Sequence, residues 1–439
     1  MWEIVGIIAF FLLIMASIAL HEIGHLVPAK KFGVKVTEYM VGFGPTIWSR
    51  KKGETSYGVK AIPVGGYIRM IGMLPPPKGA PPGTAGRMST GRLAMLVEDA
   101  RQQSLEEVAP GDENRVFYKL PVHQRVIIML GGPFMNLVLA FVLFAAVLVG
   151  IGVPQPTLQV SAVVPCTPTV SAPTGAANAD GSCPTQASPA ALAGLQAGDT
   201  IVAVDGQPPA TWDAMTSAIR ESGGATVEVT VQRPDGTTAV LPIQIVEVTR
   251  PVYDESGQPT GQTQTTGFVG VRPEVAYVPQ SWASVPAQMW DMTVRSVVAL
   301  VSLPVRLYEL VTETLIGGGE RQVDSPVSVV GVSRLGGDIV ASDEPVQAKI
   351  AIFLGLAASL NLFLFLFNLL PILPLDGGHV AGALYEGGRR QWARVRGRPD
   401  PGPVDVARLL PIAYVVAIAL VGVGAIVIFA DLVKPLTLG

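Results

Sequence analysis

The sequence predicts an α-helical membrane protein with four transmembrane helices, a membrane-associated β hairpin region and one external α/β domain. Of its 439 residues, 49% are hydrophobic and only 15% are charged, whereas an ordinary soluble chain has about 25% charged residues. Four long runs contain no charge: they are Ile4–Leu20, Val126–Val153, Ile350–Leu375 and Leu409–Ala430. Each is at or near the roughly 20 residues that a helix needs to cross a bilayer, the first when it continues to Val27. This composition excludes a soluble globule.

The charges between these runs predict the orientation. Residues 28–125 hold 15 Lys or Arg against 8 Asp or Glu, and residues 373–408 hold 6 against 4, whereas residues 154–349 hold 9 against 19. By the positive-inside rule, the first and third connections face the cytoplasm and the long middle stretch faces out. The net charge of -3 excludes little by itself, because it hides these two opposite regions. The expected partners are membrane proteins and membrane lipid, and no nucleic acid is expected.

The chain is accordingly divided into eight segments. These are a first helix at 1–27, a cytoplasmic loop at 28–124 with a β region at 32–72, a second helix at 125–153, an external domain at 154–275, interfacial amphipathic helices at 276–349, a third helix at 350–375, a cytoplasmic loop at 376–408 and a fourth helix at 409–431. The first helix is not interpreted as a signal peptide, because Glu3 stands where basic residues are expected and no small-residue cleavage site follows.

The β region is predicted from short β-branched or aromatic runs that alternate with glycines between Phe32 and Gly72. This stretch is too rich in glycine for a helix and too apolar for a solvated loop, so short strands or hairpins against the membrane are expected.

In the external segment, a Pro- and Ala-rich lead-in at 160–185 is followed by helix and strand signals that resemble a bacterial PDZ domain. The expected elements are a short helix, a strand at 201–204, a helix at 211–221 and strands at 226–232 and 238–248. Cys166 and Cys183 lie in this segment, either as a disulfide or as two free thiols. Residues 281–316 are apolar but interrupted by charges, which favours a pair of interfacial amphipathic helices or a helix packed on the PDZ domain.

A metal motif closes the first helix. His21-Glu22-Ile23-Gly24-His25 matches H-E-x-x-H, in which two histidines on one helical face bind Zn²⁺ and the glutamate reaches the metal-bound water. Ionisable residues at the end of a membrane span are expensive and functional by default.

A catalytic zinc needs a third protein ligand, for which Asp376 is the best candidate. It follows the third uncharged run, which brings it to the cytoplasmic level of the two histidines. His123 is a weaker candidate because it precedes the second helix. His379, three residues after Asp376, is expected to have a supporting or structural role, with direct ligation as the alternative.

These motifs resemble the site-2 protease family of intramembrane zinc metalloproteases, and their order is similar to that of its regulator-of-sigma-E protease group. The resemblance rests on HEIGH, FGVKVTEYMVGFGP, IPVGGYIRM, GGPFMN, the PDZ-like segment and NLLPILPLDGGH. It implies His21, His25 and Asp376 as zinc ligands, Glu22 as the catalytic base, and a bacterial inner-membrane protein.

The resemblance also implies a substrate-binding role for Asn368 and Pro371, and a membrane-reentrant β loop. Because a substrate helix must unwind before cleavage, two glycine-rich strands are expected to bind it by strand addition, one around Gly42–Pro45, with Gly42, Phe43 and Gly44, and one around Pro63–Tyr67. The implied substrates are single-span membrane proteins, such as an anti-sigma factor or remnant signal peptides. A non-catalytic PDZ adaptor with a structural metal is the alternative, but it would favour four protein ligands. A metal transporter would need ionisable residues deep in several spans, which are almost absent here.

Overall fold

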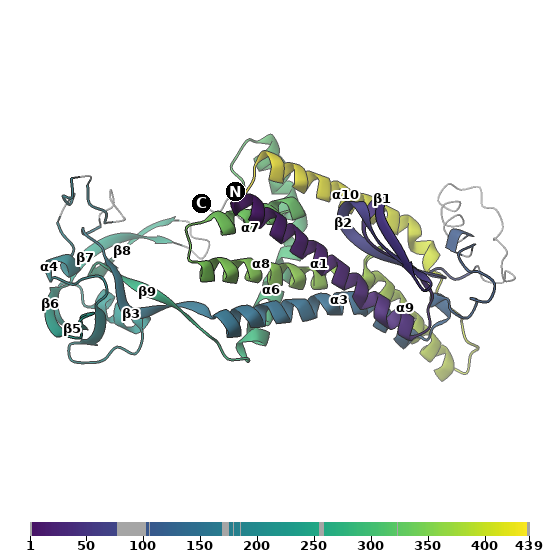
Figure 1. The fold of residues 1–439 in the computed structure, drawn as a ribbon, viewed down its shortest axis with the longest axis horizontal. Helices are drawn as coiled ribbons and strands as arrows, with labels where there is room; N and C mark the ends of the chain where they lie inside the picture. Colours follow the sequence, from purple (N-terminus) through teal and green to yellow (C-terminus); the bar gives the residue numbers. More distant parts are fainter. Residues whose placement is uncertain are drawn as a thin grey trace. The chain divides into compact units, whose positions relative to one another are not determined.

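The computed structural model describes residues 2–76, 102–104, 106–168, 175–178, 180–184, 186–253, 259–322 and 324–436. They form two compact units, Met1–Ile151 together with Ser281–Gly439, and Gly152–Gln280. Figure 1 shows their helices and strands. Residues 77–101 and 105 of the predicted cytoplasmic loop at 28–124 lie outside these ranges.

The four predicted membrane helices are confirmed as helices long and apolar enough to cross a membrane. They are α1 (Trp2–Lys31), α3 (Val122–Ala145) with its π-helical continuation η2 (Ala146–Ile151), α8 (Val346–Asn368) and α10 (Leu410–Val433). Large apolar side chains such as Leu12 and Ile418 point outward and are mostly exposed, as expected of surfaces that meet lipid.

The remaining helices of this unit differ from the sequence prediction. Residues 284–316 form one continuous helix, α6 (Ser284–Glu309) with a π-helical end η3 (Leu310–Ile316), in place of a pair of helices. It packs on α3 and α8 and belongs to the same unit as they do. A further helix, α7 (Val329–Ala341), packs on α1 through Gly6, Gly336 and Gly337.

The end of the third predicted span also needs correction. Helix α8 stops at Asn368, seven residues before the predicted end, and residues 376–408, expected to be a loop, begin with helix α9 (Asp376–Val395). Pro371 and Pro374 explain the break, because each lacks an amide hydrogen and disfavours helical backbone in the residue before it. Asp376 is therefore the first residue of a new helix. Two short 3₁₀ turns, η1 (Phe117–Lys119) and η4 (Val406–Leu409), complete the unit.

The β region is a hairpin of β1 (Val36–Lys52) and β2 (Thr55–Met70), which bends into four short segments. Residues 36–41 lie centrally and pair with 66–70 on one side and with 56–59 on the other, while 46–52 pairs with 55–60. Glycines with positive φ at Gly42, Gly44 and Gly65 permit the reversals. The two outer segments, 46–52 and 66–70, are thus the edges of a small sheet.

The second unit is a five-stranded sheet with two short helices and a separate hairpin. The sheet order is β6 (Thr238–Gln244), β5 (Thr226–Gln232), β4 (Thr200–Val204), β3 (Val153–Val163) and β9 (Val271–Val278). The other elements are α4 (Pro189–Leu192), α5 (Trp212–Glu221) and the hairpin of β7 (Val246–Tyr253) and β8 (Pro259–Phe268).

The sequence places α4, β4, α5 and β5 correctly. It merges β6 and β7 into one strand at 238–248, and it does not predict β3, β8 or β9, since it assigns residues 160–163 of β3 to an irregular lead-in. The core forms around Ile201, Trp212 and Val231. Cys166 and Cys183 form a disulfide, which resolves the alternative left open by the sequence.

Candidate metal centre

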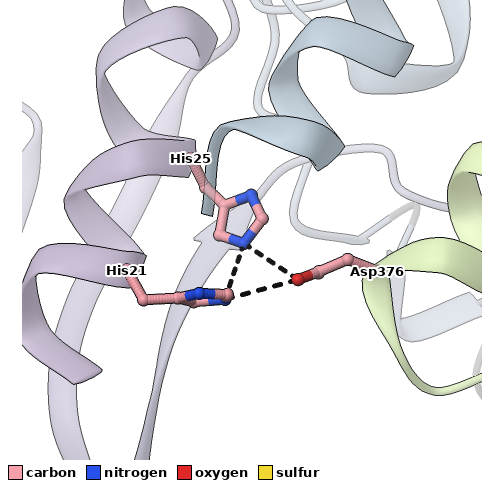
Figure 2. Close-up of side chains that lie close together, drawn as sticks. All are labelled: His21, His25 and Asp376. Atoms are coloured by element: carbon pink, nitrogen blue, oxygen red, sulfur yellow. Dashed lines mark hydrogen bonds and ion pairs between the residues drawn. The ribbon is translucent and has the colours of Figure 1, made fainter. Parts of the chain in front are cut away.

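Three side chains from two helices converge on one point (Figure 2). His21 and His25 lie one turn apart near the end of α1, so both imidazoles face the same side, and their Nε2 atoms are 3.2 Å apart. Oδ2 of Asp376, at the start of α9, lies 3.3 Å from each of these nitrogens. Within the described part of the chain, this is the one group of three or more His, Cys, Asp or Glu side chains close enough to share a metal ion.

The backbone of α3 orients His25. Nδ1 of His25 donates a hydrogen bond of 2.8 Å to the carbonyl oxygen of Ile128. Because a carbonyl can only accept, this contact fixes the proton on Nδ1 and leaves the Nε2 lone pair directed at the other two side chains. Such a contact is the usual support for a metal-binding histidine.

A glycine on α3 leaves room for the histidine rings. A Cβ atom at Gly132 would lie 2.1 Å from Nε2 of His25 and 2.6 Å from Nε2 of His21. The neighbouring Gly131 touches the backbone of α1 directly, since a Cβ there would lie 2.0 Å from the carbonyl oxygen of Gly24. The GGPFMN motif therefore lets the two helices approach until the rings lie against bare backbone.

The geometry and chemistry of the three side chains fit zinc. Ligand atoms at 2.0–2.2 Å from a tetrahedral ion are about 3.3 Å apart, which matches the observed spacings of 3.2 and 3.3 Å. Two imidazoles and a carboxylate leave one tetrahedral position for water, as in catalytic zinc sites.

Glu22 lies beside this cluster but is not part of it. Its side chain is 9% exposed and lies against the edge segment 66–70 of the hairpin. A Cβ at Gly66 would be 3.0 Å from Cγ of Glu22. The glutamate is thus held between the metal-binding residues and an open sheet edge.

A buried ion pair joins the two helices that support the cluster. Arg125 on α3 donates to both carboxylate oxygens of Glu386 on α9, at 2.5 and 3.1 Å, and the two side chains are 7% and 1% exposed. Burial would raise the pKa of Glu386, but hydrogen bonds from Arg125 and from the amide of Val404 outweigh it and hold the pKa below its usual value. The pair fixes α9, and with it Asp376, against the helix that orients His25.

The two other histidines lie outside the cluster. His123 is exposed at the start of α3 and does not join the ligand group. His379 lines a small cavity together with Arg125 and Glu386. Burial lowers its pKa, which favours the neutral imidazole.

Among the described residues, no hydrogen bond or ion pair joins the residues predicted to bind substrate to the metal-binding side chains. Asn368 is half-buried at the end of α8. Pro371 is exposed and lines a cavity of about 740 Å³ with residues of α9, η4 and α10. Gly42, Phe43 and Gly44 form a bend of β1, where the ring of Phe43 stacks on Tyr67.

Asn361, two turns earlier on α8, is fully buried and donates to Ser17 Oγ of α1 at 3.1 Å. This contact gives Asn361 a role in helix packing.

Sequence reasoning missed Gly132, Ile128 and the Arg125–Glu386 pair as supports of the cluster. Gly132 belongs to GGPFMN, but no local pattern indicates which imidazoles a glycine must accommodate. The ion pair joins residues 261 positions apart, and an isolated Arg and Glu carry no signal of pairing.

The chain resembles known proteins along its whole length. The model for "Peptidase family M50" matches residues 9–399. Zinc metalloprotease Rip1 of Mycobacterium tuberculosis is 37% identical over 443 residues that cover 100% of both chains, and Rip1 of Mycolicibacterium smegmatis is 35% identical, covering 99% and 98%. The "Regulator of sigma-W protease RasP" of Bacillus subtilis is 26% identical, covering 90% of this chain and 91% of the relative.

Gly132→Ala tests the fit of the histidine rings against α3. The added methyl would overlap both Nε2 atoms, so zinc binding should weaken by about 10-fold or more, measured by competition with a chelator. Gly150→Ala is the matched control, because a Cβ at Gly150, on the π-helical continuation of α3, would meet nothing within 4 Å. Unchanged zinc affinity in Gly132→Ala would contradict the proposed fit.

Glu386→Gln tests the ion pair that fixes α9. It leaves the guanidinium of Arg125 buried without its counter-charge, so the free energy of unfolding should fall by about 3 kcal/mol, measured by denaturant titration in micelles. Asp291→Asn removes an ion pair whose partners are 52% and 74% exposed, and should cost less than about 1 kcal/mol. Equal effects of the two substitutions would rule out the structural role of Glu386.

Proposed function

The chain belongs to peptidase family M50, the site-2 protease family of zinc metalloproteases, and from that premise we propose that it hydrolyses a peptide bond inside the membrane-spanning segment of another protein. One observation carries the proposal. Two histidines near the end of the apolar helix α1 and an aspartate at the start of α9 place their Nε2 and Oδ2 atoms 3.2–3.3 Å apart, and a buried glutamate lies beside them. This combination suits proteolysis next to lipid.

In the proposed mechanism, His21, His25 and Asp376 hold the zinc ion and Glu22 moves the proton. When bound there, zinc supplies a Lewis acid that polarises the scissile carbonyl and acidifies the attacking water. The carboxylate of Glu22 accepts the proton of that water as it attacks, and then delivers it to the leaving amine. The burial of Glu22 and its position one residue from a ligand suit this transfer.

The hairpin supports a proposal for how substrate is bound. A membrane-spanning helix satisfies its own amides, so it must unwind and find new partners before it is cut. The edge segment 66–70 lies against Glu22 and offers backbone groups for strand addition. We assign the Gly42-Phe43-Gly44 bend, Asn368 and Pro371 to the path that the unwound segment follows.

The proposed substrates are single-span membrane proteins of a bacterial cell membrane. The name of the B. subtilis relative indicates control of a sigma factor, which favours an anti-sigma factor as one substrate, with remnant signal peptides as another. In this proposal the chain crosses the membrane four times, with the metal centre near the cytoplasmic side. Residues 154–275 lie outside as a PDZ domain that excludes substrates not yet shortened there.

Glu22→Gln separates proton transfer from metal binding. The amide cannot accept the proton of the attacking water, so cleavage should fall by about 10²–10⁴-fold while zinc content stays at the wild-type level. Wild-type and variant proteins are incubated in detergent with candidate single-span substrates, and the products are mapped by mass spectrometry. Glu3→Gln, at the start of the same helix, is the control. Full cleavage by zinc-loaded Glu22→Gln would overturn the mechanism.

A further inference from the structure

The outer edge of the hairpin sheet, residues 46–52, has no protein cover among the described residues. Every side chain from Phe43 to Lys52 is exposed. Within residues 46–52, two of them are large and apolar, Ile47 at 70% and Trp48 at 57% exposure. The segment pairs with 55–60 on one side, and no described residue pairs with its other edge.

The sheet register fixes the depth of Trp48 along α1. Trp48 lies opposite Val59, Val59 lies beside Val41, and Val41 lies opposite Gly66. Gly66 in turn lies against Ile18 and Glu22 of α1. The exposed indole is therefore in the same row of the sheet as the contact with Glu22.

Cations occupy the other end of the same segment. Arg50, Lys51 and Lys52 follow Trp48, and at about 3.3 Å per strand residue Lys52 lies about 13 Å further along. That end lies beside the end of α1, where the Lys30 amine donates to the Tyr57 hydroxyl at 2.8 Å. Apolar side chains and cations are thus separated along the strand.

Arg50, Lys51 and Lys52 form no ion pair with any residue that the structure describes. The one acid between Thr46 and Lys60 is Glu54, and its two oxygens accept from Arg115 at 2.6 and 2.8 Å. The exposed segment therefore keeps its positive charge.

We propose that residues 46–52 are a binding surface for anionic phospholipid, with Ile47 and Trp48 among the acyl chains and Arg50, Lys51 and Lys52 on the phosphate groups. The proposal rests on the membrane placement in the proposed function. An indole among lipid chains and cations at the headgroups are the arrangement that a charged leaflet favours. At about 3.3 Å per strand residue, the three cations lie about 7–13 Å beyond Trp48, toward one end of the segment.

Fluorescence of Trp48 tests the proposal in the full-length protein reconstituted into bilayers. The Trp48 signal is the difference between wild type and Trp48→Phe. Brominated phosphatidylglycerol should quench this signal about twofold more than brominated phosphatidylcholine at the same mole fraction, because each cation near an anionic surface adds attraction. High salt should remove the difference by screening.

The triple variant Arg50→Gln, Lys51→Gln, Lys52→Gln should quench equally with the two lipids. The matched control is Arg394→Gln, Arg396→Gln, Arg398→Gln, which removes the same charge from exposed positions at the end of α9 and should keep the preference. Wild-type zinc content shows that each variant is folded, and the salt titration needs no variant other than Trp48→Phe.

Two outcomes overturn the proposal. One is equal quenching by both lipids in wild type at low salt. The other is a Trp48 signal that neither lipid quenches, as expected if a second copy or a protein partner covers the segment. Neither outcome depends on proteolysis, so failure here is distinguishable from failure of the peptidase proposal, which Glu22→Gln tests.

Discussion

The metal centre depends on direct contact between the backbones of α1 and α3 at their glycines. At Gly24, Gly131 and Gly132 there is no space for a single methyl group. Close approach of this kind is how helices associate where no hydrophobic force drives them together. Here it also has a chemical consequence, because it brings the Ile128 carbonyl within 2.8 Å of His25. If the two helices were slightly farther apart, His25 would lose its hydrogen bond to Ile128, and the helix packing would be lost as well.

The third metal-binding residue depends on a break in the chain. Had α8 continued to Leu375, Asp376 would lie on that helix. The two prolines end α8 early, and the chain turns so that Asp376 begins α9. The buried Arg125–Glu386 pair then holds α9 against α3. Replacing such a pair with apolar residues often leaves the free energy of unfolding unchanged. Its main role here is therefore to fix the position of α9, which carries Asp376, against α3, which orients His25.

The sequence predicts what depends on local pattern or on composition. The four uncharged runs identify the long helices, and H-E-x-x-H with Asp376 identifies the residues that the structure brings within 3.3 Å of each other. It does not predict α7 or α9, whose glycines and charges weaken any helical signal. Nor does it predict the role of Gly132 or the pairing of Arg125 with Glu386. Both features depend on which distant segments come into contact in the folded chain, and a single sequence does not show which segments do so. Asn361 shows the same limit, since only its contact with Ser17 identifies it as a packing residue.

The two edges of the hairpin sheet differ in a way that bears on the proposed function. In lipid an unpaired edge is costly, because water is absent and each free backbone group lacks a partner. It is also hazardous, since any extended chain can pair with it. On the outer edge, Arg50, Lys51 and Lys52 oppose such pairing, and in the proposed membrane placement they would reach the headgroup layer. The inner edge at 66–70 has Glu22 against it. Under the proposed function, an unwound segment would therefore add to the edge beside the proposed catalytic base, because the cationic edge disfavours strand addition.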